Sequence, residues 1–246
     1  VELICQGFSS DMKDPTDADL KLIYNHSLYY LFRLMFILNC EAKGLLSVHK
    51  QSDYFPHSLR ALCGKIKAEH ETNQVWSKQF SSYHHINDLF DLLVSGDEKI
   101  GIHGFGKEAF ASGDAKFYKD NPIPNAYLND VLLELAFAED KKEKTLLFID
   151  YKKLAADHLG SLFEGLLEFS LVKDGKANEL VLRTSSGERK ATGSYYTPQH
   201  VVDYVVAETL NPLVKDKSIN EILELKVVDP AMGSGHFLLG TVRFLE

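Results

Sequence analysis

The sequence predicts a mainly α-helical protein whose C-terminal end changes to α/β structure. Apolar residues recur at helical spacing over most of the chain. They predict one long helix that ends at Leu38 and further helices over residues 59–76, 85–93, 126–137 and 159–171. Near the C-terminal end, the β-favouring residues 225–229 precede a proline, a glycine turn and a helix-permissive run, which is the order strand, turn, helix. Together these patterns indicate a helical domain followed by the start of an α/β domain.

The elements before this turn are predicted from local signals. The first long helix is expected to have Asp14 as its cap and Pro15 in its first turn, and its most apolar stretch, 28–38, is too short to span a bilayer. Residues 96–124 carry repeated glycines and prolines and are expected to form a long loop region. The polar residues 184–193 predict a hinge between a helical connector domain, 1–183, and a second domain, 194–246.

The composition is typical of a cytoplasmic globular protein and does not indicate a main DNA-binding surface. The cysteines are odd in number and widely spaced, which predicts reduced thiols and neither a disulfide framework nor a metal site. The net charge is -8, and the densest basic run, at residues 141–144, lies among acids. Because a duplex DNA site needs a row of lysines and arginines, the main DNA-binding surface is not expected here.

The turn at residues 225–240 reads Leu-Lys-Val-Val-Asp-Pro-Ala-Met-Gly-Ser-Gly-His-Phe-Leu-Leu-Gly. Gly233 and Gly235 leave room for a ligand to approach the backbone, and Asp229 suits an ammonium or a sulfonium better than a phosphate. The third glycine of a dinucleotide fingerprint is replaced by Leu238, and the lysine of a polyphosphate loop is missing. An αβ turn whose glycines serve only close packing is the alternative interpretation.

A second segment, Tyr196-Thr197-Pro198, stands before another helical pattern. Thr197 is predicted to be the N-cap residue and Pro198 the first helical residue. The valines that follow are spaced to bury one face of the helix, from residue 201 to Leu210.

In this order and spacing, the Tyr-Thr-Pro and Asp-Pro-Ala-Met-Gly-Ser-Gly segments resemble the opening of the amino-type DNA methyltransferases that modify adenine at N6. Residues 149–154 and 159–168 resemble the segment before the methylase in type IIG restriction-modification enzymes and related phage-defence methyltransferases, and residues 30–46 resemble their preceding long helix. The resemblance implies a truncated Rossmann-like methyltransferase domain that holds S-adenosyl-L-methionine. It assigns this cofactor to Tyr196, Thr197, Pro198, Asp229, Pro230, Ala231, Gly233 and Gly235.

The methyl-transfer motif of that family, an Asn or Asp followed by Pro-Pro and an aromatic residue, has no counterpart in this chain. The segments that start at Asn121 and Asn211 do not match it. We therefore expect an N-terminal or internal fragment that is inactive by itself, with double-stranded DNA bound mostly through other regions and no membrane contact. Mg²⁺ is expected only if the parent protein carries a nuclease.

Two other function classes fit the same residues. One is a non-catalytic helical scaffold that links a nuclease module to a methylase, and the other is a methyltransferase that acts on RNA or protein. An Asn-Pro-Pro-Tyr type motif elsewhere in the parent protein would favour DNA amino methylation over both.

Overall fold

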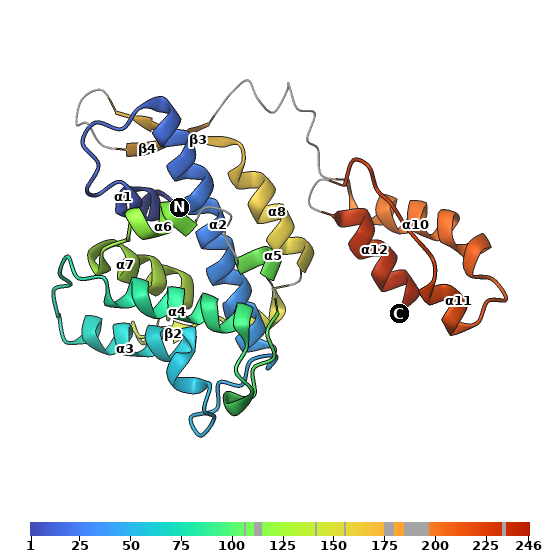
Figure 1. Cartoon of the computed structure of the whole chain (residues 1–246), viewed down its shortest axis with the longest axis horizontal. Helices are drawn as coiled ribbons and strands as arrows, with labels where there is room; N and C mark the ends of the chain where they lie inside the picture. Colours follow the sequence, from blue (N-terminus) through green and yellow to red (C-terminus); the bar gives the residue numbers. More distant parts are fainter. Residues whose placement is uncertain are drawn as a thin grey trace. The chain divides into compact units, whose positions relative to one another are not determined.

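The computed structural model describes residues 1–105, 107–110, 115–140, 142–154, 156–174, 180–184, 197–232 and 235–246. The chain divides into two compact units, residues 1–154 with 170–183, and residues 155–169 with 184–246. Both units are built mainly from helices, which confirms the predicted mainly α-helical class (Figure 1). Of the predicted hinge 184–193, every residue after Thr184 lies outside the described residues.

The first unit contains helices, short 3₁₀ turns and two small two-stranded sheets. Its helices are α1 (Glu2–Phe8), α2 (Asp17–Ala42), α3 (Leu59–Glu71), α4 (Ser81–Ser95), α5 (Lys107–Phe110), α6 (Ala115–Asp120) and α7 (Asn125–Ala136). Its 3₁₀ turns are η1 (Phe55–His57), η2 (Glu98–Ile100) and η3 (Tyr151–Lys153). Its sheets pair β1 (Phe137–Glu139) with β2 (Leu146–Phe148) and β3 (Phe169–Lys173) with β4 (Leu180–Thr184).

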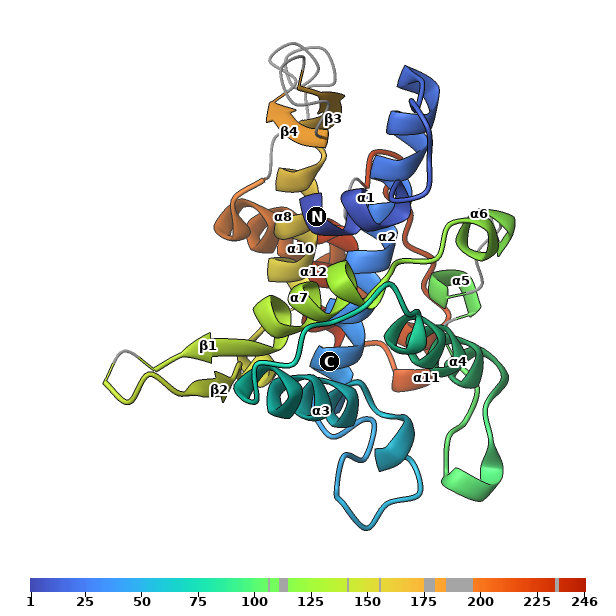
Figure 2. The same cartoon turned by 90° about the vertical axis from the view of Figure 1, so that its left-hand side faces the viewer.

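The long helix α2 runs through the first unit (Figures 1 and 2). Many of its side chains are buried. It packs against α1 and α3, while α7 packs against α1, α3 and α4. Its side chains at Ile23, Leu34 and Ile37 are fully buried. Near its C-terminal end, the Asn39 amide donates to the carbonyl oxygens of Tyr151 and Leu154, at 2.9 and 2.7 Å, which ties α2 to η3.

The predicted start of α2 is wrong by two residues. Thr16 is the N-cap: its hydroxyl accepts from the Asp19 N–H at 3.3 Å, and the Asp19 carboxylate accepts from the Thr16 N–H at 2.9 Å. This reciprocal pair is a capping box. Asp14 has φ 54°, in the left-handed region, so it cannot take the extended backbone that an N-cap residue needs.

Several predicted boundaries also differ from the structure. Residues 96–124 are not one long loop, because they contain η2, α5 and α6. The predicted helix over 59–76 ends at Glu71, shortly before Asn73 turns the backbone left-handed at φ 55°. The predicted helix over 159–171 ends at Leu166, because the chain enters β3 at Phe169.

The second unit contains α8 (Ala156–Leu166), α10 (Gln199–Val214), α11 (Ile219–Leu223) and α12 (His236–Leu245). The strand predicted over residues 225–229 is not formed. A strand needs a neighbour to accept and donate its backbone hydrogen bonds, and no strand pairs with this segment among the described residues. Val228 is accordingly 81% exposed. The Rossmann-like sheet therefore stays a prediction.

Within the described ranges, no helix combines the length and the apolar character that crossing a membrane requires.

A buried carboxylate joins two helices of the first unit. Glu41, near the C-terminal end of α2, is 4% exposed. It accepts hydrogen bonds from the Tyr54 hydroxyl at 2.9 Å and from the backbone N–H groups of Leu59 and Arg60 at 2.8 and 2.9 Å. The two N–H groups belong to the first turn of α3, where backbone donors have no partner within the helix. Glu41 therefore acts as a cap supplied by another helix.

We expect Glu41→Ala to lower the free energy of unfolding by about 3–5 kcal/mol, because it leaves several buried donors without an acceptor. The matched control is Glu71→Ala, which removes a 56% exposed carboxylate that pairs with Lys67 at 3.6 Å. This control should cost less than about 1 kcal/mol. Urea unfolding measures both variants, and equal losses in the two would contradict the assigned role of Glu41.

Glu41 also makes stability depend on pH. Burial raises the pKa of this carboxyl from 4.5 to about 7, although the hydrogen bonds from Tyr54, Leu59 and Arg60 act to lower it. The folded protein therefore holds this proton more tightly than the unfolded chain. The contribution to stability is fully present below pH 4.5 and is lost as the pH rises through about 7. Comparing urea unfolding of the unmodified protein and Glu41→Gln at pH 5 and pH 8 should show a steeper fall in the unmodified protein. Parallel pH profiles would refute this linkage.

Candidate functional site

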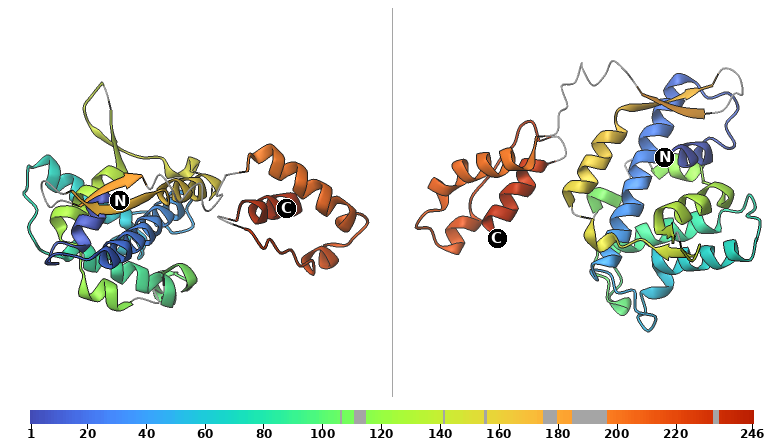
Figure 3. Two further views of the ribbon diagram at one scale, coloured as in Figure 1. Left: turned by 90° about the horizontal axis from the view of Figure 1, so that it is seen from above. Right: turned by 180° about the vertical axis from the view of Figure 1, so that it is seen from behind.

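Two helices and a returning segment form the framework of the second unit. Figures 1 and 3 show α10 and α12 side by side, with their N-terminal ends at the same end of the unit. The residues between α11 and α12 run back along them to the start of α12 (Figure 3). Val202, Val206 and Leu210 of α10 are buried and pack against Phe237, Phe244 and Leu245 of α12.

Gly240 sets the spacing of these two helices. A Cβ atom at this position would lie 2.9 Å from the Val202 Cγ1 atom and 3.5 Å from the Val206 Cγ2 atom. Real carbon contacts are not as short as the first of these, so the helices could not approach this closely with a larger residue at position 240. The glycine therefore lets α10 and α12 pack directly against each other.

The start of α10 lies one residue later than predicted. Pro198 is the N-cap, with φ -56° and ψ 141°, and its carbonyl accepts from the N–H groups of Val201 and Val202 at 2.9 and 3.2 Å. Its extended ψ places it outside the helix, so Gln199 is the first helical residue and Thr197 lies before the cap. Thr197 is half-buried there. Tyr196 lies outside the described residues.

The loop before α12 is organised by its own acidic residue. The Asp229 carboxylate accepts the Ala231 N–H at 3.0 Å, which turns the chain at Pro230. Asp229 is half-buried, whereas Pro230 and Ala231 are exposed. Such a turn uses one carboxylate oxygen and leaves the second oxygen able to accept from a ligand.

Gly235 is the N-cap of α12 and has φ 81° and ψ 24°, in the left-handed region that favours glycine. Its N–H donates to the Met232 carbonyl at 2.7 Å, and its carbonyl accepts from the Leu239 N–H at 2.9 Å. Among the described residues, nothing beyond its chain neighbours lies within 4 Å of a Cβ atom placed at Gly235. The backbone is therefore open to a ligand on this side. Gly233, the other predicted glycine, lies outside the described residues.

The structure brings the two predicted segments to one end of the second unit. Thr197 and Pro198 directly precede α10, Gly235 begins α12, and both helices start at this end (Figures 1 and 3). The residues present fit the methionine part of S-adenosyl-L-methionine in chemical type. A carboxylate can accept from its ammonium, and the outward N–H groups of the first turn of α12 can donate to its carboxylate.

Two polar side chains with buried atoms, Gln199 and His236, lie next to predicted site residues and were not among the candidates from the sequence. The Gln199 amide donates through Nε2 to Asp203 at 2.7 Å, and its Oε1 is buried without a hydrogen-bond partner within the described part of the chain. His236, the first residue of α12, is also buried. Each directly follows a predicted site residue, namely Pro198 or Gly235. That adjacency is the signal in the sequence that could have drawn attention to them.

Comparison with known proteins identifies relatives of this chain. Residues 173–246 match the family described as N-6 DNA Methylase. The chain is 30% identical over 174 residues to the adenine-specific methyltransferase PglX of Streptomyces coelicolor, which covers 63% of this chain and 13% of that protein. It is 26% identical over 175 residues to the putative type II restriction enzyme and methyltransferase RM.MjaORFECS2P of Methanocaldococcus jannaschii, which covers 52% of this chain and 14% of that protein.

These matches extend beyond the candidate site. The similarity to the Streptomyces coelicolor protein covers more of the chain than residues 173–246 alone, so it includes part of the preceding sequence. The chain spans only a small part of the length of both relatives. No solved structure matches it.

The contact at Gly240 predicts an energetic coupling between α10 and α12. Gly240→Ala forces the new methyl group against Val202, so its cost should be smaller by about 1–2 kcal/mol in a Val202→Ala background. Hydrogen exchange of the α10 and α12 amides measures this coupling. The matched control is Gly165→Ala on α8, where a Cβ atom has no neighbour within 4 Å in the described part of the chain, and it should show no coupling to Val202. Additive effects of Gly240→Ala and Val202→Ala would contradict the close approach.

Proposed function

We propose that the parent protein of this chain methylates adenine N6 in double-stranded DNA. Residues 173–246 match the N-6 DNA Methylase family, and the chain is similar to adenine methyltransferases of the restriction-modification and defence type, which supports this proposal. The methyl donor in this proposal is S-adenosyl-L-methionine, and the protein is of the type IIG-like kind. The chain is a cytoplasmic part of this larger enzyme and lacks the catalytic motif.

The observation that carries the proposal is that Asp229 and Gly235 both lie in the short loop before α12. Asp229 places a carboxylate at the end of the returning segment, with one oxygen engaged by Ala231 at 3.0 Å. Gly235 starts α12 with a left-handed backbone and open space beside it. In the proposed complex, Asp229 accepts from the cofactor ammonium, and the backbone at Gly235 approaches the methionine part.

The remaining candidate residues have supporting roles in this proposal. Thr197 and Pro198 border the cofactor from the start of α10, and Tyr196 and Gly233 complete the two segments. Pro230 and Ala231 hold the turn that presents Asp229. When bound, the cofactor supplies a methyl group on a positively charged sulfur, which is transferable to a nitrogen nucleophile. The described residues bind and orient this donor, and the residues that hold the flipped adenine belong to other parts of the parent protein.

Electrostatics disfavour a phosphate ligand at this turn. Asp229 would repel a polyphosphate, whereas it attracts the ammonium and sulfonium groups of the proposed cofactor. The charge therefore distinguishes this site from nucleotide-binding turns of similar shape.

The experiment uses the parent protein and the variant Asp229→Asn, which keeps an oxygen for the Ala231 N–H but removes the charge. Loss of one charge-assisted hydrogen bond should weaken cofactor binding about 10–100-fold, with a parallel loss of tritiated methyl transfer to unmethylated duplex DNA at subsaturating cofactor. DNA binding should be unchanged. Glu224→Gln, which changes an exposed carboxylate in the same segment, is the matched control and should behave as the unmodified protein.

Other outcomes would decide against the proposal. If the Asp229→Asn variant transferred methyl groups as well as the unmodified protein, the assignment of Asp229 to the cofactor site would be wrong. If the parent protein methylated RNA or protein but not DNA, the proposed DNA substrate would be wrong. Absence of cofactor binding by the unmodified parent protein would favour the non-catalytic scaffold.

A further inference from the structure

The first residue of α10, Gln199, has a side-chain amide whose orientation is fixed. Its Nε2 atom donates to the Asp203 carboxylate, one turn further along the same helix, at 2.7 Å. An ionised carboxylate only accepts hydrogen bonds, so the amide nitrogen must face Asp203 and the amide oxygen must face away from it. Asp203 therefore holds Gln199 Oε1 as an acceptor with a defined direction.

Gln199 lies on the face of α10 that packs against α12. The buried residues of this face lie three, seven and eleven positions after it, at Val202, Val206 and Leu210. This is the spacing of one helix face. Val202 is the residue that a Cβ atom at Gly240 of α12 would meet at 2.9 Å. Gln199 is one turn nearer to the start of α10 than Val202, and both helices start at the same end of the unit (Figure 3). Gln199 therefore faces the first turn of α12.

The Gln199 Oε1 atom is an acceptor without a donor. The residue as a whole is partly exposed, but this atom is buried and has no hydrogen-bond partner within the described part of the chain. A buried polar atom in this state costs about 1–3 kcal/mol. The amide nitrogen is satisfied by Asp203, so the cost falls on the oxygen alone. Such an atom indicates a donor other than the described residues.

The candidate cofactor site supplies a donor of the matching kind. In the proposed complex, the methionine part of S-adenosyl-L-methionine lies at the start of α12. Its ammonium is the only hydrogen-bond donor in that part, because an ionised carboxylate and a sulfonium have no N–H or O–H bond. An ammonium has several N–H bonds, and Asp229 leaves some of them for a further acceptor.

We propose that Gln199 Oε1 is this further acceptor for the cofactor ammonium and that Asp203 positions it. The role of Gln199 rests on the proposed function, because it adds a residue to the same cofactor site. Asp229 supplies the charge from the loop before α12, and Gln199 supplies a neutral oxygen from the first turn of α10. Together they distinguish a ligand that has a free amino group from one that lacks it.

Calorimetry on the parent protein with two ligands tests this role. S-adenosyl-L-homocysteine has the ammonium, whereas methylthioadenosine has the nucleoside and no amino-acid part. Gln199→Met keeps the approximate length of the side chain and removes the acceptor. It should weaken the binding of S-adenosyl-L-homocysteine about tenfold or more and leave the binding of methylthioadenosine within about twofold. The matched control, His200→Met, places the same residue at the next position, which is exposed, and should change neither affinity.

Asp203 provides a second variant at an exposed position, so its substitution does not alter the packing of α10 on α12. Asp203→Ala releases the amide of Gln199. It should weaken the binding of S-adenosyl-L-homocysteine about three- to tenfold and leave the binding of methylthioadenosine unchanged. In a Gln199→Met background it should have no further effect, because Asp203 acts through Gln199.

Three results would overturn the assignment. The first is unchanged binding of S-adenosyl-L-homocysteine by Gln199→Met. The second is an equal loss for both ligands, which would mean that the substitution disturbs the second unit as a whole. The third is an additive effect of Asp203→Ala and Gln199→Met, which would contradict the positioning by Asp203.

The same measurements separate this role from the proposed function. If Asp229→Asn weakens the binding of S-adenosyl-L-homocysteine and Gln199→Met does not, the cofactor site stands and the role of Gln199 is wrong. If the unmodified parent protein does not bind S-adenosyl-L-homocysteine, both the proposed function and the role of Gln199 are wrong.

Discussion

The buried carboxylate of Glu41 is the interaction on which the arrangement of the first unit depends. It joins the C-terminal end of α2 to the first turn of α3 through two backbone N–H groups and the Tyr54 hydroxyl. An apolar residue could fill the same space but could not satisfy these donors. The cost of burying the carboxylate is visible in its pKa, which burial raises to about 7. Because hydrogen bonds have preferred directions, these contacts fix the position of the first turn of α3 relative to the end of α2.

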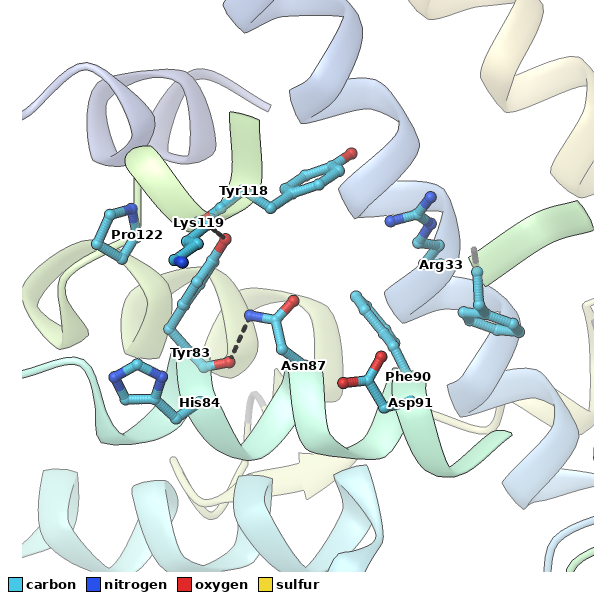
Figure 4. A pocket seen from close by; sticks show the side chains of 10 residues that line it. Arg33, Tyr83, His84, Asn87, Phe90, Asp91, Tyr118, Lys119 and Pro122 are labelled. Carbon is cyan, nitrogen blue, oxygen red and sulfur yellow. Dashed lines mark hydrogen bonds between the residues drawn. The ribbon is translucent and has the colours of Figure 1, made fainter. Parts of the chain in front are cut away.

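Helix α3, which this junction positions, supports the hairpin of β1 and β2. Lys67 of α3 donates to the Leu146 carbonyl at 2.7 Å, and the Arg60 guanidinium lies over the Phe148 ring at 4.2 Å from its centroid. The hairpin of β1 and β2 is thus held on α3 by cationic side chains (Figure 2). Further along α2 toward its N-terminal end, the Arg33 guanidinium carbon lies 5.6 Å from the ring centroid of Phe90 and 5.3 Å from that of Tyr118 (Figure 4). One helix therefore positions both α3, which supports the hairpin, and the aromatic rings around Arg33.

The second unit is held together differently from the first. Its segment between α11 and α12 has no neighbouring strand among the described residues. Its shape comes instead from local turns and from one close helix contact. Asp229 turns the chain by accepting from Ala231, Gly235 takes the left-handed backbone, and Gly240 lets α12 lie directly on Val202. The proposed cofactor residues are consequently held by the loop itself and by the packing of α10 on α12.

The amino-acid sequence by itself determined those features that depend on near neighbours. The helical class, the turn from Asp229 to Gly235 and the segment before α10 follow from short-range backbone chemistry, and the family resemblance rests on the same residues. Short-range signals also explain the errors at helix ends. Asp14 and Thr197 are both good capping residues, and only the backbone angles show that Thr16 and Pro198 take these positions.

Only the tertiary structure decided the features that join distant residues. Glu41 lies 18 residues from Leu59 in the chain, and no periodicity relates them. Arg33 likewise lies beside the rings of Phe90 and Tyr118, which belong to two other helices. Residues 225–229 show the reverse case: their β-favouring side chains predict a strand, but a strand forms only when another strand supplies hydrogen-bond partners. Such pairings are properties of the packed chain, because burial and hydrogen bonding between elements depend on positions that local sequence does not encode.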